Sequence, residues 1–99
     1  YDRINMSQKY TIQGIDFEEY NLRLLYRIMM VDQQFISDVS DVDNQPPDFR
    51  STLSYLTDIQ FLKKTTQDEQ PSTITWSATD TMKDFWSESQ SEIEVILGL

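Results

Sequence analysis

The sequence contains no cysteine and no histidine, and only two glycines and three prolines occur among its 99 residues. Without cysteine the chain has no disulfide scaffold, no thiolate zinc site and no thiol nucleophile. Without histidine, Ser–His nucleophilic catalysis and histidine-based pH switching are excluded as well. These absences remove several classes of function, and they leave the function itself open.

Basic residues are also scarce. Eight Lys and Arg face 17 Asp and Glu, which gives a formal net charge of −9. Such a field repels phosphate backbones, so indiscriminate binding to nucleic acid is not expected, although a local basic face can still make contact. The length fits one domain, and a hydrophobic content of 38% is enough for one modest core.

No long hydrophobic run is present. Arg27 interrupts the apolar stretch at residues 24–31, and the apolar residues 95–97 are too few to cross a bilayer. The first thirty residues lack the basic start and uninterrupted apolar stretch of a signal peptide. We therefore expect a soluble, cytoplasmic protein with no membrane partner. We expect Met6 to be the natural start and residues 1–5 to be a cloning remnant or a processed end.

The N-terminal part predicts an extended lead-in followed by a long helix. Residues 10–13 alternate weakly and stop at Gly14, so residues 1–15 form the lead-in and residues 16–99 the domain. Asp16 and Glu19 have the spacing of a helix-starting capping box, and Glu19, Arg23 and Arg27 are spaced for ion pairs along one helix face. Apolar residues follow at helical spacing: Phe17, Tyr20, Leu24, Ile28, Val31 and Phe35.

The middle of the chain predicts a second and a third helix. Ile36, Val39 and Val42 keep a three-residue rhythm, which fits either a short helix or the end of the first one. The residue before a proline is disfavoured in helices, so Pro46 and Pro47 end that segment, and Pro47 suits the first position of the next helix. That helix is predicted over residues 48–60, with apolar residues at helical spacing: Phe49, Leu53, Leu56 and Ile59.

The last third predicts a hairpin and a terminal helix. Residues 61–64 and 73–76 are β-prone and are joined by a polar tip of about eight residues, which indicates two paired strands. Ser77 or Thr79 can cap a helix over residues 79–97. Residues 92–95 also alternate, which leaves a strand there as the alternative. The apolar face of the helix comprises Met82, Phe85, Trp86, Ser89, Ile93 and Leu97.

Two stretches resemble a known domain. Residues 48–64 (DFRSTLSYLTDIQFLKK) resemble the recognition helix of a winged helix-turn-helix domain and the strand that follows it. Residues 74–83 (ITWSATDTMK) are similar to the closing wing strand and the capped next helix of MarR- and PadR-type regulators. The resemblance implies an α+β, mostly helical winged helix, with a three-helix core, a β-hairpin wing and a C-terminal helix.

The same resemblance implies a small DNA-binding transcriptional regulator that binds a specific double-stranded site as a homodimer. On the predicted third helix, Arg50, Ser51, Ser54 and Thr57 would face base edges, because Arg suits guanine and small hydroxyls suit any edge. Lys63 and Lys64 would contact phosphates. In such regulators the terminal helix commonly dimerises, and the corresponding residues here are Phe85, Trp86, Ile93, Ile96 and Leu97. The alternative is that this helix closes the core over Leu24 and Ile28.

A second interpretation stays open. The polar tip at residues 67–70 is acidic where a wing that contacts phosphate is usually basic, and carboxylates are spread along the whole chain. These features suit an acidic winged-helix module that binds a basic protein partner, acts as an inhibitor or mimics nucleic acid without binding DNA. Carboxylate pairs such as Asp41 and Asp43 have no residues that complete a catalytic or metal site, so we expect no enzyme, no metal and no cofactor.

Overall fold

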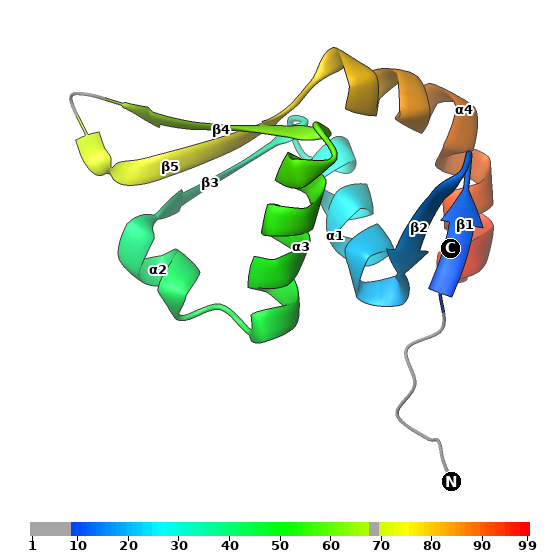
Figure 1. The fold of residues 1–99 in the computed structure, drawn as a ribbon, viewed down its shortest axis with the longest axis horizontal. Helices are drawn as coiled ribbons and strands as arrows, with labels where there is room; N and C mark the ends of the chain where they lie inside the picture. Colours follow the sequence, from blue (N-terminus) through cyan, green and yellow to red (C-terminus); the bar gives the residue numbers. More distant parts are fainter. Residues whose placement is uncertain (1–8, 68–69) are drawn as a thin grey trace, which may run out of the picture.

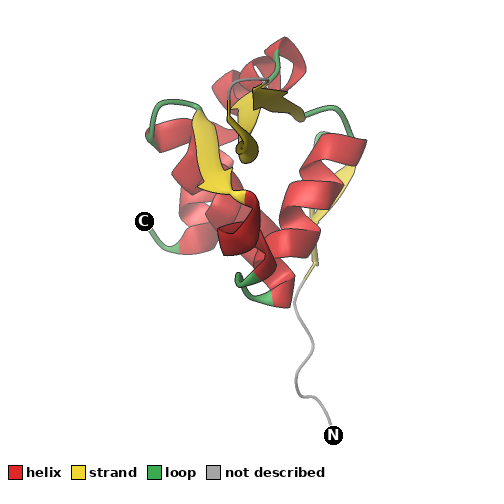
Figure 2. Ribbon diagram, turned by 90° about the vertical axis from the view of Figure 1, so that its left-hand side faces the viewer, coloured by secondary structure: helices red, strands yellow, loops and turns green. Residues whose placement is uncertain are grey.

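The part of the chain that the structure describes folds into four amphipathic helices and two small antiparallel sheets, an α+β fold (Figure 1). The computed structural model describes residues 9–67 and 70–99, so residues 1–5, Met6 and the centre of the predicted acidic tip lie outside the described part. In Figure 1 the three-stranded sheet lies at one end and the N-terminal hairpin beside α4 at the other, with α1 and α3 between them. The helices make up most of the molecule in the perpendicular view (Figure 2).

The N-terminal segment is a tight hairpin. Strands β1 (Lys9–Ile12) and β2 (Ile15–Glu18) pair antiparallel around Gln13 and Gly14, whose φ angles of 52° and 79° are those of a two-residue primed turn. Ile12 is 1% exposed, so the predicted lead-in contributes to the core. The predicted helix start at Asp16 is wrong, because residues 15–18 pair with β1 instead.

Helix α1 (Glu19–Met30) begins two residues later than predicted. Glu18 is its N-cap residue, and the Glu18 N–H donates to Asn21 Oδ1 at 2.8 Å. The predicted ion pair between Glu19 and Arg23 is confirmed, with 2.8 Å between Arg23 Nη2 and Glu19 Oε2. Residues Asp32 and Gln33 then take positive φ angles of 61° and 57°, which ends the helical region before Phe35.

Phe35 and Ile36 therefore lie on a strand that the helical spacing did not predict. Strand β3 (Gln34–Asp38) pairs with β5, and the three-stranded sheet has the order β3-β5-β4. A short helix, α2 (Val39–Asp43), follows, so the predicted second helix is confirmed only for its last part. Phe35 is the cross-strand neighbour of Trp76, and their ring centroids are 5.8 Å apart.

The predicted third helix is confirmed, and so is the pairing of two strands in a hairpin, but the predicted polar tip of about eight residues is wrong, because residues 65–67 and 70–72 belong to the strands. Helix α3 (Pro47–Asp58) has Pro47 at its start, and strands β4 (Leu62–Gln67) and β5 (Gln70–Ala78) pair antiparallel. Gln60, with a φ of 67°, takes the left-handed conformation between α3 and β4 that glycine adopts most easily.

The predicted cap of the last helix is also confirmed. Thr79 Oγ1 accepts a hydrogen bond from the Met82 N–H at 3.2 Å and donates to the Gln60 carbonyl at 2.6 Å. Helix α4 (Asp80–Leu97) runs from this cap to Gly98, which is left-handed with a φ of 77°. Residues 92–95 are helical, so the strand alternative for them is wrong.

An aromatic cluster at the centre of the core joins the N-terminal hairpin to α4. The centroid of the Phe85 ring lies 4.9 Å from the centroid of the Phe61 ring and 5.5 Å from that of the Phe17 ring. Three of the predicted dimerisation residues, Phe85, Trp86 and Ile93, are at most 9% exposed and belong to this core. This corrects their predicted role, because side chains that fill the core of one chain do not form a surface for a second copy.

Within residues 9–67 and 70–99, none of the helices is both long enough and apolar enough to span a membrane.

Candidate functional site

The outward side of α3 and the adjoining face of the β4–β5 hairpin enclose a hollow of about 270 Å³. Four of the six predicted DNA contacts line it, namely Arg50, Ser54, Thr57 and Lys64. Val42, Leu53, Asp58 and Trp76 complete the lining. The fold thus brings together side chains from two separate elements, α3 and β4.

The spacing on α3 explains why its members share a face. Residues three and four apart on a helix are neighbours, so Arg50, Ser54 and Thr57 form one row. Leu53 and Leu56 are buried in the core, which fixes the rotation of the helix about its axis. Arg50 and Ser54 are exposed, and Thr57 is half-buried with its hydroxyl donating to the Leu53 carbonyl at 2.7 Å.

Strand alternation separates the two lysines. Lys64 lies directly across from Trp76 in the β4–β5 register, so its side chain is on the face of the sheet that carries Trp76. Lys63 lies across from Ser77 and points to the opposite face. The two predicted phosphate contacts are therefore not equivalent, because only Lys64 lines the hollow.

Trp76 lies beneath the ammonium group of Lys64. The Lys64 Nζ lies 6.0 Å from the centroid of the Trp76 ring, a distance at which a cation–π interaction is attractive. The Trp76 ring is 4% exposed and packs against the ring of Phe35. The Phe35 ring also packs against Phe49 of α3, with 5.1 Å between the two ring centroids. The Trp76 ring thereby favours a position of the ammonium group in the hollow that Lys64 shares with the polar row on α3.

The local charge differs in sign from that of the whole chain. Arg50 and Lys64 supply two positive charges to the hollow and Asp58 one negative charge, whereas the chain as a whole carries −9. The neighbouring helix α2, whose Val42 reaches the hollow, carries exposed Asp41 and Asp43. The basic surface is therefore small and has an acidic border.

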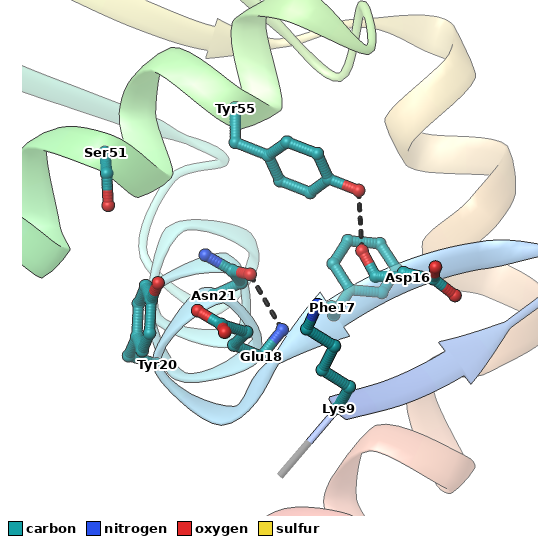
Figure 3. Close-up of a pocket in the computed structure, with 8 residues that line it drawn as sticks. All are labelled: Lys9, Asp16, Phe17, Glu18, Tyr20, Asn21, Ser51 and Tyr55. Carbon is teal, nitrogen blue, oxygen red and sulfur yellow. Dashed lines mark hydrogen bonds between the residues drawn. The ribbon is translucent and has the colours of Figure 1, made fainter. Parts of the chain in front are cut away.

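Ser51 lies elsewhere. It lines a second hollow of about 300 Å³ on another side of α3, together with Tyr20, Asn21 and Tyr55 (Figure 3). Its hydroxyl donates to the Asp48 carbonyl at 3.1 Å. Of the six predicted contacts, Ser51 and Lys63 are thus the two that the fold does not bring to the first hollow.

Sequence reasoning missed Trp76 as a member of the site. It lies in the predicted second strand of the hairpin, but its role depends on the register that places it opposite Lys64. That register follows from the pairing of the strands across the hairpin, which a polar tip without a recognisable turn motif does not specify.

Among residues 9–67 and 70–99, no cluster of three or more Asp and Glu side chains has the geometry to hold a metal ion.

Comparison with known proteins gives no relative for this chain. It matches no protein-family model, and no curated protein or solved structure is significantly similar to it.

Proposed function

We propose that this protein is a small winged-helix transcriptional regulator that binds a specific DNA duplex through α3 and the β4–β5 hairpin. The order α1-β3-α2-α3-β4-β5-α4 supports this proposal, because it matches a three-helix core followed by a β-hairpin wing and a C-terminal helix. The sheet order β3-β5-β4 is consistent with it as well, with the strand before α2 pairing to the second strand of the hairpin.

The convergence of Arg50, Ser54, Thr57 and Lys64 on one hollow carries the proposal. An α-helix fits the major groove, where Arg50 can donate two hydrogen bonds to a guanine and Ser54 can contact a base edge or a phosphate. Lys64, held over Trp76, is placed to neutralise a backbone phosphate next to the helix. In this arrangement α3 reads the sequence and the hairpin positions it.

A nuclear magnetic resonance titration tests which face binds. A duplex of about two helical turns is added at about 50 mM salt, where weak phosphate contacts persist. We expect amide shifts along α3 and β4 and none along α4. Arg50→Ala should cost about 1–3 kcal/mol of specific binding, whereas Arg23→Ala, a control that removes the same charge from α1, should not. Shifts confined to other elements, or equal effects of the two variants, would contradict the assignment.

We also propose that the protein is a homodimer, formed through the end of α4. Ile96 and Leu97 are half-buried there, next to Val95 and Leu99, which are 78% and 70% exposed. A Val95→Asp, Leu99→Asp double variant should sediment as a folded monomer, since neither residue belongs to the core. A wild-type protein that already sediments as a monomer would overturn the dimer.

A second function rests on a different surface. Asp80, Asp84, Glu88 and Glu92 are all exposed and recur every four residues, so they form one acidic row along α4. This row supports the alternative of an acidic module that binds a basic protein without DNA. In that case the duplex would cause no shifts, and a lysine-rich peptide would shift the amides of α4.

A further inference from the structure

The hollow shown in Figure 3 lies on another side of α3 from the proposed DNA contacts. The elements that border it are β1, β2, the first turn of α1, and α3. It has a volume of about 300 Å³, which is at the lower end of the range for small-molecule sites. Nothing in the proposed function uses this hollow.

The walls of the hollow are held in place before any ligand arrives. Asn21 is buried and bonds on both sides, with Oδ1 accepting from the Glu18 N–H and Nδ2 donating to Thr52 Oγ1, each at 2.8 Å. The Tyr55 hydroxyl donates to the Asp16 carbonyl at 2.6 Å (Figure 3). The Tyr55 ring also meets the buried Phe17 ring edge-on at 6.1 Å. A site built in this way loses little entropy when it binds.

The lining combines aromatic rings with one carboxylate that faces the hollow. The Glu18 carboxylate lies next to Tyr20, and hydrogen bonding between the phenol and this carboxylate is the main reason that the pKa of Tyr20 is raised, followed by burial and then by the negative charge of Glu18. The other carboxylate, on Asp16, is already engaged, since Asp16 Oδ1 accepts from Thr11 Oγ1 at 2.7 Å and the group points away from the hollow in Figure 3. The Glu18 carboxylate takes part in the capping box of α1 with Asn21, and its remaining lone pairs would accept from a ligand in the hollow.

We propose that this hollow binds a small organic cation with a flat aromatic body, such as an amidinium. The positive group would pair with the Glu18 carboxylate, and the body would lie against the rings of Tyr20 and Tyr55. Carboxylates and aromatic faces both favour cations, and the net charge of −9 raises the local concentration of cations over that of anions. Lys9, the cross-strand partner of Glu18, also lines the hollow, and its ammonium group would compete with such a ligand for this carboxylate.

Titration with benzamidine, followed by amide shifts, tests the proposal. Benzoate has the same shape and the opposite charge, so it serves as the matched probe. We expect saturable binding of benzamidine with a Kd of about 1 mM, a reasonable affinity for so small a ligand. Its shifts should centre on Glu18, Asn21, Ser51 and Tyr55, and benzoate should cause none there.

Variants give the decisive contrast. Glu18→Gln keeps the shape of the side chain and should weaken benzamidine about tenfold, whereas Lys9→Met removes the competing cation and should tighten it. Asp84→Asn, which removes a carboxylate from α4, should change nothing. The proposal fails if benzamidine does not saturate, if benzoate shifts the same amides, or if Lys9→Met weakens binding. Lys9→Met leaves the start of α1 intact, so its effect on benzamidine affinity tests the proposal even if Glu18→Gln perturbs the fold.

Discussion

Lys64 and Trp76 are cross-strand partners, and the Lys64 ammonium lies 6.0 Å from the centroid of the Trp76 ring. Trp76 is buried against Phe35, so the ring is a fixed platform, while Lys64 is exposed. This pair explains how an acidic chain can present a positive group beside Arg50 on α3. It also makes the two adjacent lysines unequal.

The first prediction compares these two lysines. Lys64→Ala should weaken DNA binding more than Lys63→Ala, because only Lys64 shares the face of the sheet with the α3 row. Each substitution should lower the affinity for DNA without changing the preference for sequence. Lys64→Ala should also reduce the dependence of log affinity on log salt concentration by the amount expected for about one phosphate contact. Fluorescence anisotropy at several salt concentrations measures both effects. Equal losses for the two variants would mean that the hairpin approaches DNA in another orientation.

The second prediction concerns the cap of α4. Thr79→Ala should lower the free energy of unfolding by about 1–2 kcal/mol. The Thr79 hydroxyl caps the Met82 N–H and also bonds to the Gln60 carbonyl, which ties α4 to the end of α3. Urea denaturation gives the value. Thr81→Ala, an exposed change two residues further along α4, should have little effect, and a similar loss there would argue against a specific role of the cap.

The third prediction separates the core of α4 from its exposed end. Phe85→Ala should destabilise the chain by about 3–5 kcal/mol, because it opens a cavity in the aromatic cluster with Phe17 and Phe61. Val95→Ala, at a position that is mostly exposed, should stay within about 0.5 kcal/mol. Thermal and urea unfolding compare the two. A Phe85→Ala protein of normal stability would place this side chain outside the core.

The fourth prediction follows from two tyrosines. The pKa of Tyr20 is raised above the ordinary 10.0, chiefly by the Glu18 carboxylate, and burial followed by the charge of Asp16 raises that of Tyr55. A group whose pKa is higher in the folded state contributes stability that is lost as the pH rises through that pKa. The free energy of unfolding should therefore fall above about pH 10. Urea denaturation at increasing pH measures the fall, and Tyr20→Phe should make it shallower; an unchanged slope would contradict the assignment.

Local signals explain most of what the sequence predicted about the fold. Proline at the start of α3, the threonine cap of α4 and the β-prone residues of β4 and β5 each act over a few residues, and all three are confirmed. Strands β2 and β3 were not predicted. Helix α1 ends because Asp32 and Gln33 take left-handed backbone conformations, and neither residue is a glycine that would have marked this break in the sequence. Phe35 falls at helical spacing from α1 by coincidence, although it lies on β3.

The site was only partly predictable, because some of its residues are brought together by helical spacing and others by strand pairing. Helical spacing alone places Arg50, Ser54 and Thr57 in one row, so those residues came together as expected. The separation of Lys63 from Lys64 needs the strand register. An apolar stripe on a terminal helix fits a core as well as a dimer surface, so Phe85, Trp86 and Ile93 could not be assigned before their packing was known.

Selection from a pool of randomised duplexes tests the central proposal most directly. The purified protein is incubated with the pool at about 50 mM salt, and bound duplexes are recovered over several rounds. The proposed function predicts enrichment of one roughly palindromic motif, with enrichment lost in Arg50→Ala. Recovery of no motif, together with no shift of any duplex at that salt, would contradict DNA binding and favour the acidic row on α4 as the functional surface.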